Sequence, residues 1–251
     1  KYVQENSDLF FKDYESGNMF LWNISTFCMF NWTNFKILLD VLIHFSPELI
    51  KTKNTELDLI DIFNLMIWTV YYLYSKKVIS IESIIKTAEY RNLYYVYFYP
   101  EIQNFLDKSK KEEIEREGFL DNLEIFEENR KIAENDKFIC KLIRNDNIDD
   151  FISHVNRINY PLMSEIQPSI FETNSFLLKN TSSLIEYSAF FGSIQIMKFL
   201  FLNKVKLTPS LWIYSIHGRN PDMIHFLEDN QIKPNDASYK ECLNESLKCH
   251  H

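Results

Sequence analysis

The stretch that decides the fold is SLIEYSAFFGSIQIMKFL at residues 183–200, because SLWIYSIHGRNPDMIHFL at residues 210–227 reads as its copy. Leu184 and Leu211 lie 27 residues apart. The same offset joins Tyr187 to Tyr214, Phe199 to Phe226, Leu200 to Leu227 and Asn203 to Asn230. A fixed period of this kind indicates stacked units that cannot bury their apolar faces alone, and such stacks form binding surfaces.

Each copy contains two short apolar runs separated by a break of small or polar residues. In the first copy the break is Phe191-Gly192-Ser193, and apolar residues recur at helical spacing on both sides of it. Gly192 can adopt the positive φ that ends a helix, and Ser193 can cap the next one. Each copy is therefore predicted to be a hairpin of two antiparallel helices.

The first copy resembles an ankyrin repeat, whose pattern is Thr-Pro-Leu-His-x-Ala-Ala-x-x-Gly-His-x-x-Ile-Val-x-x-Leu-Leu. The matching positions are Ser183 to Glu186, Ser188-Ala189, Gly192, and Ile196, Met197, Leu200 and Phe201. The second copy has Ser215-Ile216 at the Ala pair and Gly218 one place early. The chain is similar to divergent ankyrin families, expanded in some unicellular eukaryotes, in which a helical region precedes the repeats.

Three departures from the pattern carry expectations of their own. The Thr-Pro and His residues that normally form the hydrogen-bonded start of the first helix are absent. Lys204 and Gln231 stand where a Gly usually ends the second helix. The short period predicts that plain loops, at residues 204–209 and 231–236, replace the β-hairpin fingers between units.

The array is expected to occupy residues 137–251. A degenerate unit is expected at residues 137–180, clear units at 181–207 and 208–235, and a truncated one at 236–251. The degenerate unit reads as helix, Asn-Asp break and helix over residues 138–152, followed by a long loop at residues 156–180. Because the chain starts without Met and stops inside a unit, we expect a fragment of a longer protein.

Residues 1–120 are expected to form a helical N-terminal domain. Helices are predicted at residues 34–45, 55–74 and 80–88, and aromatic residues are dense at residues 94–99. The 251 residues are 46% hydrophobic and contain only four Gly and seven Pro, which argues against a turn-rich β-sandwich. The fold class is therefore all-α, a helical domain followed by an ankyrin-like α-solenoid. Residues 121–136 are expected to be a charged linker.

Chemistry other than binding is not indicated. No phosphate loop, nucleophile elbow or metalloprotease motif is present, so we expect no enzyme activity, no catalytic residue and no cofactor. The terminal Cys242, Cys249, His250 and His251 lack the paired spacing of zinc ligands, so no metal site is expected. A net charge of −8 disfavours nucleic acid.

The chain is expected to be cytoplasmic and to lack a membrane span. The best apolar run, residues 60–74, contains Asp61 and is shorter than the roughly 20 residues that a bilayer requires. The four cysteines are dispersed, as in reduced intracellular proteins. Sequons such as Asn180-Thr181-Ser182 are expected by chance in an Asn-rich chain.

The resemblance implies that an unidentified protein partner contacts the exposed side of the first helices and the loops between units. The residues that occupy these places are Glu186, Tyr187, Phe190, Phe191, Ile213, Tyr214, His217, Gly218, Lys206, Thr208, Lys233 and Asn235. Aromatic residues there suit binding hot spots, but the same aromatics suit a buried core equally well.

Two other roles remain open at this point. The repeats could be the regulatory or targeting arm of a longer enzyme whose catalytic domain is absent from this chain. The N-terminal helices, or the open end of the array, could instead mediate self-association.

Overall fold

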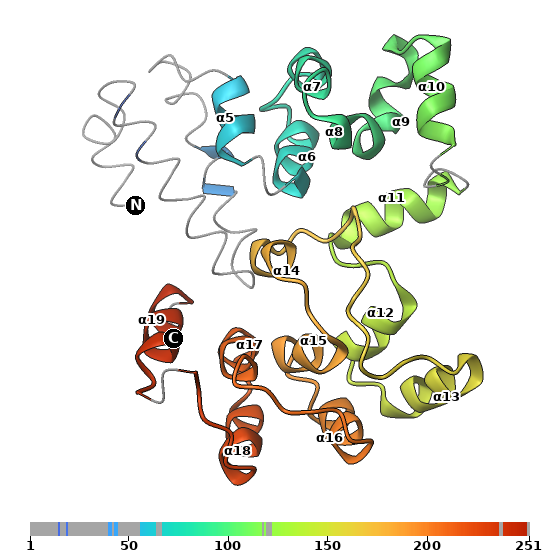
Figure 1. The fold of residues 1–251 in the computed structure, drawn as a ribbon. Coiled ribbons are helices and arrows are strands. Elements are labelled where there is room, and N and C mark those ends of the chain that lie inside the picture. The colour runs from blue at the N-terminus through green and yellow to red at the C-terminus, as the bar shows by residue number, and fades with distance from the viewer. Residues whose placement is uncertain are drawn as a thin grey trace. The chain divides into compact units, whose positions relative to one another are not determined.

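The computed structural model describes residues 15, 19, 40, 41, 43, 44, 56–63, 67–116, 118, 122–235 and 238–249. The described residues form helices, turns and loops with no strand, so the chain is all-α as predicted (Figure 1). The helix expected at residues 34–45 lies outside the described residues, except that Asp40, Val41, Ile43 and His44 are helical. The chain divides into two compact units, residues 1–134 with 173–175, and residues 135–172 with 176–251.

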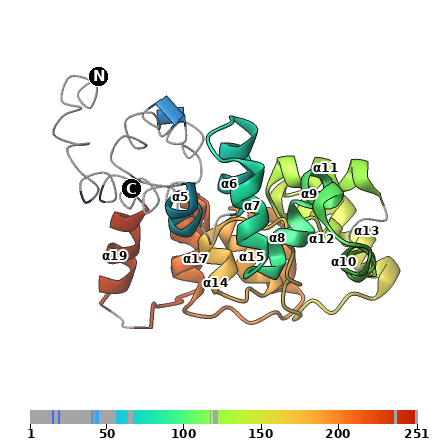
Figure 2. The same ribbon diagram turned by 90° about the horizontal axis from the view of Figure 1, so that it is seen from above.

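The first unit is built from short helices that alternate with tight turns (Figure 2). Their bounds are α5 Glu56–Ile62, α6 Ile67–Ser75, α7 Ile81–Ala88, α8 Asn92–Tyr97, α9 Tyr99–Ile102, η2 Gln103–Phe105, α10 Lys108–Glu115 and α11 Leu123–Ile132. The single helix predicted at residues 55–74 is thus two elements, with Phe63 in a turn, and nothing in the described residues explains the interruption. The helix predicted at residues 80–88 is confirmed, with Ser80 as its N-cap.

The aromatic run at residues 94–99 forms much of the first unit's core. Tyr94, Tyr97, Phe98 and Tyr99 are all buried. The rings of Tyr94 and Phe98 stack at 5.4 Å, and Tyr97 meets Phe98 edge-on at 5.5 Å. Aromatic pairs favour these offset and edge-to-face geometries, so the cluster fixes how α8 and α9 pack.

Residues 121–136, expected to be a charged linker, instead contain a helix that belongs to the first unit. Arg130 of α11 is 2% exposed. Its guanidinium makes two hydrogen bonds, of 2.8 Å and 2.7 Å, to the carboxylate of Glu101 and lies 4.2 Å from the ring centroid of Tyr71. A charged side chain can be buried when it is paired and hydrogen-bonded, as Arg130 is with Glu101. The many charged residues of the segment favoured a linker and did not indicate that one of them is buried.

The second unit consists of helical hairpins that lie side by side, followed by one further helix (Figure 1). The hairpins are α12 Phe138–Arg144 with α13 Ile148–Ile158, α15 Leu184–Phe190 with α16 Ile194–Leu202, and α17 Leu211–Gly218 with α18 Pro221–Asp229. The final helix is α19 Lys240–Lys248, and α14 Ser175–Lys179 interrupts the long loop after α13. The first helices pack in the order α12, α15, α17, α19.

Equivalent positions of the two clear hairpins are buried in one continuous core. Leu184 and Leu211, which are 27 residues apart in the sequence, are both fully buried there, and so are Leu200 and Leu227. The loops at residues 204–209 and 231–235 contain no strand among the described residues, and Val205 and Leu207 point into the core. The 27-residue period in the sequence therefore corresponds to a repeat of buried positions in the second unit.

Left-handed residues mark the same two places in each hairpin. Asp146, Gly192 and Arg219 follow the first helices with φ of 45°, 68° and 51°. Asn159, Lys204 and Gln231 follow the second helices with φ of 50°, 68° and 58°. Two of these residues, Lys204 and Gln231, occupy the positions where the sequence lacks the usual Gly. The backbone thus adopts the ending that the repeat requires despite a side-chain penalty of about 1–2 kcal/mol.

The first helices of neighbouring hairpins approach so closely that small residues are required between them. A Cβ atom on Gly218 would lie 2.5 Å from the carbonyl oxygen of Ala189. Ser188, Ala189 and Ser215 are fully buried along the same seam. Gly218 was expected at a partner-binding surface, but here it allows α17 to approach the backbone of α15.

Hydrogen bonds join the turns of neighbouring hairpins. The amide of Asn220 donates to the carbonyl oxygen of Gly192 at 2.8 Å, and the hydroxyl of Ser193 donates to that of Ile143. Asp146 accepts from the backbone N–H groups of Gln195 and Ile196, at 3.0 Å each. Ser193, the predicted N-cap of α16, therefore bonds to the preceding hairpin instead. Asp146 of that preceding hairpin caps α16 in its place.

We predict that Gly218→Ala destabilises the chain. Helix propensity alone would make this change stabilising by about 0.5–1 kcal/mol. The clash with the Ala189 carbonyl should reverse the sign and cost about 1–3 kcal/mol of unfolding free energy. Urea unfolding measures the difference, with Lys198→Ala at an exposed position of α16 as the control. A Gly218→Ala chain as stable as wild type would contradict the close approach.

A second prediction concerns Glu56, whose carboxylate accepts hydrogen bonds from the backbone N–H of Ser80 and the hydroxyls of Ser80 and Ser83. Burial raises the pKa of Glu56, but these hydrogen bonds outweigh it, and the pKa falls below its usual 4.5. Its stabilising contribution is therefore complete above about pH 4.5 and is lost as the pH falls through the lower folded-state value.

Glu56→Gln should therefore have a lower free energy of unfolding than wild type at pH 7. The difference between the two free energies should become smaller below about pH 4.5. Urea unfolding at a series of pH values tests this expectation, with the exposed Glu127→Gln as the control. A gap that stays constant from pH 7 to pH 3 would show that the carboxylate charge is not what Ser80 and Ser83 recognise.

Candidate interaction groove

A groove of about 580 Å³ runs across the first helices of the second unit. Its lining comes from α14, α15, α17 and α19 and the loops next to them. The lining residues are Phe176, Lys179, Asn180, Thr181, Glu186, Ser210, Ile213, Tyr214, Asn235, Glu241, Asn244, Glu245 and Lys248. Two of the lining helices, α15 and α17, are the first helices of neighbouring hairpins, so the stacking of the hairpins shapes the groove.

Glu186 fixes one wall of the groove. Ser183 caps α15 in a capping box, in which the Glu186 carboxylate accepts from the backbone N–H of Ser183 at 2.9 Å. The other carboxylate oxygen accepts from the hydroxyl of Ser210 at 2.6 Å. Ser183 and Ser210 are equivalent positions, 27 residues apart, so this one side chain joins the starts of two neighbouring helices.

An aromatic cluster forms the apolar floor around Phe176. Its ring stacks on Phe190 with centroids 5.8 Å apart and meets Tyr214 edge-on at 5.0 Å. The hydroxyl of Tyr214 accepts from Ser182 at 3.3 Å, and burial raises the pKa of Tyr214. Phe176 lies in a segment expected to be loop, so only the structure shows that α14 adds an aromatic ring to this face.

Four of the residues expected to meet a partner line the groove, namely Glu186, Ile213, Tyr214 and Asn235. Others are structural. Tyr187 is 1% exposed and Phe190 is buried, and the Tyr187 hydroxyl accepts a 3.0 Å hydrogen bond from Arg144. Phe191 packs against the Tyr187 ring at 4.7 Å. A surface role for Tyr187 and Phe190 is therefore corrected, because each ring fills space between neighbouring helices. Tyr214 lines the groove, but its side chain also belongs to the core and is 5% exposed.

Of the four loop residues expected to meet a partner, Asn235 lines the groove, and Lys206, Thr208 and Lys233 lie outside it. Lys206 and Lys233 are exposed, and the hydroxyl of Thr208 hydrogen-bonds with that of Ser210 at 2.8 Å. His217 faces α19, where its ring nitrogen Nε2 is 3.0 Å from the Glu245 carboxylate.

The contribution of α19 was missed by sequence reasoning. Glu241, Asn244, Glu245 and Lys248 all line the groove. They follow the i, i+3, i+4, i+7 spacing of one helical face, which was the signal available in the sequence. The sequence predicts only a truncated unit at residues 236–251, and it does not indicate that the polar face of this unit shares a surface with α15 and α17.

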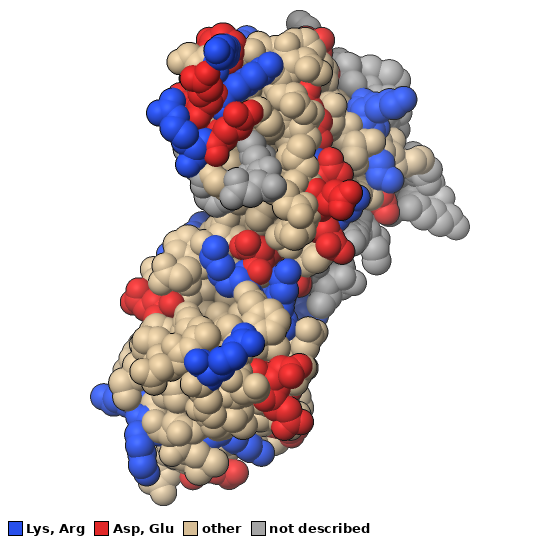
Figure 3. Space-filling model, turned by 90° about the vertical axis from the view of Figure 1, so that its right-hand side faces the viewer, with Lys and Arg blue, Asp and Glu red and all other residues tan. Residues whose placement is uncertain are grey.

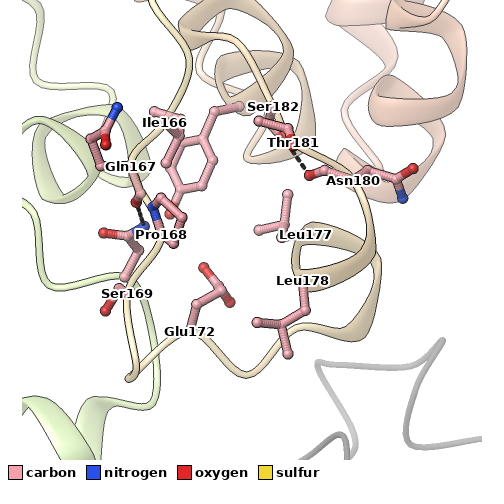
Figure 4. A pocket seen from close by; sticks show the side chains of 12 residues that line it. Ile166, Gln167, Pro168, Ser169, Glu172, Leu177, Leu178, Asn180, Thr181 and Ser182 are labelled. Atoms are coloured by element: carbon pink, nitrogen blue, oxygen red, sulfur yellow. Dashed lines mark hydrogen bonds between the residues drawn. The ribbon is translucent and has the colours of Figure 1, made fainter.

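A second, smaller pocket of about 120 Å³ lies on the same unit, between α14 and the loop that precedes it. Figure 4 shows Leu177 and Leu178 of α14 on one side and Ile166, Pro168 and Glu172 on the other. The backbone N–H of Ile166 donates to the carbonyl oxygen of Ser182 at 2.7 Å and holds the loop. Its size suits a few water molecules better than a ligand, which commonly needs about 300–1,000 Å³.

Metal-ligating side chains gather at the end of the array. His217, Glu245 and Cys249 place their ligand atoms within 4.8 Å of one another. The sequence concealed this set because His217 is 32 residues from Cys249. Burial raises the pKa of the Cys249 thiol to about 11, and hydrogen bonds from Lys248 and His217 outweigh burial to lower the pKa of Glu245.

Comparisons with known proteins assign no family. No protein-family profile, no curated protein and no solved structure matches the chain. In the part of the chain that the structure describes, every helix is too short or too polar to cross a bilayer.

We predict that Glu186→Ala lowers the unfolding free energy by about 1–2 kcal/mol, since it removes a capping box and the bond to the next helix. Ser210→Ala, which removes only the second contact, should cost less. Urea unfolding of both variants tests the bridging role. Equal costs for the two changes, or no cost for Glu186→Ala, would contradict it.

Proposed function

We propose that the chain is a non-enzymatic protein-interaction module of the ankyrin-repeat type, an α-solenoid that binds a partner in the groove. The observation that carries the proposal is the groove itself, which lies on the face that the resemblance assigns to partners. Glu186 supports the resemblance, because it occupies the His place of the motif and forms a capping box with Ser183. This capping box supplies the hydrogen-bonded start that the absent Thr-Pro and His residues would otherwise provide.

The chemistry of the groove suits a protein partner. Phe176 and Ile213 are half-buried and offer an apolar floor above the buried ring of Tyr214. Lys179 and Lys248 stand with acidic and amide side chains at the rim. An apolar centre with a polar rim is the usual anatomy of a protein interface. The partner would insert an apolar side chain and satisfy polar groups of both signs around it.

Catalysis and nucleic-acid binding fit the structure less well. Among the described residues, Cys249 is the cysteine that contacts a histidine, and it is 1% exposed. Burial raises the pKa of its thiol to about 11, which disfavours a nucleophilic thiolate. On the face shown in Figure 3, basic and acidic side chains are interspersed without a continuous basic area. A phosphate backbone needs such an area.

A cytoplasmic location is part of the proposal. Among the described residues, Cys140, Cys242 and Cys249 are not in disulfides, and all three are buried. Reduced, buried cysteines are the usual state in a reducing compartment.

A charge-matched pair of variants tests the groove. The groove variant combines Lys179→Glu with Asn244→Arg, and the control combines Lys198→Glu with Gln195→Arg on α16. All four positions are exposed, and both pairs change the net charge equally. Partners are captured from cells that produce the chain, and their affinities for the two purified variants are then measured.

The groove variant should weaken a genuine partner by about tenfold or more, which corresponds to about 1.4 kcal/mol, while the control should bind as wild type does. Circular dichroism checks that both variants keep their helical content. A partner that binds both variants equally, or that is lost only with the α16 control, would refute the groove as the interaction site.

A further inference from the structure

The cluster of His217, Glu245 and Cys249 lies where α19 meets α17. Nε2 of His217 is 3.0 Å from Oε1 of Glu245, and Sγ of Cys249 is 3.6 Å and 3.9 Å from the two ring nitrogens of His217. The side chain of His217 is 6% exposed and that of Glu245 is 11% exposed. Three different donor atoms therefore face one small, largely dry space.

The two helices present these donors for simple geometric reasons. Glu245 and Cys249 are four residues apart, which places them on the same face of α19. His217 is in the last turn of α17, and its ring lies against Phe176 and Phe190, with centroids 4.1 Å and 5.4 Å away. Two aromatic walls hold the imidazole plane in position, as packed ligands of metal sites require.

The surroundings hold the other donors as well. Lys248 donates to Oε2 of Glu245 at 2.9 Å, which leaves Oε1 directed at His217. Arg219 donates to the carbonyl oxygen of Cys249 at 2.8 Å and anchors the end of α19. Groups that orient the ligands in this way are the normal outer shell of a metal site.

We propose that His217, Glu245 and Cys249 bind a zinc ion. Thiolate, imidazole and carboxylate are the three protein donors that zinc accepts, and a thiolate disfavours the hard cations Mg²⁺ and Ca²⁺. Tetrahedral bonds of zinc to sulfur and nitrogen place the donor atoms roughly 3.3–3.6 Å apart. In the cluster, Nε2 of His217 is 3.0 Å from Oε1 of Glu245 and 3.9 Å from Sγ of Cys249, and the three ligand atoms all lie within 4.8 Å of one another. Small shifts of these side chains bring them to the separations that zinc requires. The fourth position is left for a water molecule.

Binding replaces the thiol proton of Cys249, which is released to solvent, by the metal ion. The ion would join α19 to α17 by bonds from both helices. A bond between the helices would stabilise α19, because this helix buries few of its side chains, chiefly Cys242, Glu245 and Cys249.

The test uses the full chain, loaded with Zn²⁺ or Co²⁺ and dialysed against metal-free buffer. Wild type should retain one zinc per chain, and its cobalt form should show the intense visible bands of a tetrahedral thiolate site. Cys249→Ser and Glu245→Gln should lose the metal or bind it at least about tenfold more weakly. The matched control is Cys242→Ser, which removes another buried thiol of α19 and should keep the site.

Circular dichroism establishes that each variant is folded, and zinc should raise the melting temperature of wild type and Cys242→Ser but not that of Cys249→Ser. The double change His250→Ala with His251→Ala separates the cluster from the histidines that follow it in the sequence. Metal retained by that variant supports the proposal. A wild-type chain that retains no zinc, zinc that survives Cys249→Ser, or zinc that is lost only with the two terminal histidines would each overturn it.

Discussion

A carbon atom on Gly218 would lie 2.5 Å from the carbonyl oxygen of Ala189, and the second unit depends on this close approach. It brings α17 against α15 along buried Ser188, Ala189 and Ser215. Once the helices are this close, Glu186 can cap its own helix and also accept from Ser210 of the next one. The groove over the first helices is a consequence of that spacing, because a bulkier seam would separate its walls.

The same contact explains why the two glycines of the hairpins are not interchangeable. Asp146 and Arg219 adopt the same left-handed turn as Gly192, so positive φ alone does not demand glycine there. Gly192 is glycine because a Cβ would lie 2.9 Å from the Cβ of Asn220, which bonds back to its carbonyl oxygen. Gly218, one place before its own turn, serves the approach to α15. The apparent misalignment of the second copy is therefore a difference in packing at adjoining positions.

The repeat could be predicted because equivalent apolar residues, such as Leu184 and Leu211, recur at a fixed offset and share one core. The interaction face was predicted only in part. Glu186, Ile213, Tyr214 and Asn235 line the groove. Periodicity could not decide whether Tyr187 is inside or outside, since its hydroxyl is paired inside the protein by Arg144, which is 43 residues away. Similarly, the dense charges around Arg130 predicted a linker. The burial of Arg130 could not be predicted, because its partner Glu101 is 29 residues away in the sequence. Local patterns specify helices, whereas buried polar pairs are specified by tertiary contacts.

The most direct test of the stacked-hairpin account is a nuclear Overhauser measurement between Gly218 and Gly192. The chain has only four glycines, so selective glycine labelling gives an uncrowded spectrum. A Cβ on Gly218 would lie 3.3 Å from the backbone nitrogen of Gly192, so the account predicts a strong cross-peak between the α protons of Gly218 and the amide proton of Gly192. If both resonances are assigned and no cross-peak joins them, the hairpins do not pack against each other in this way.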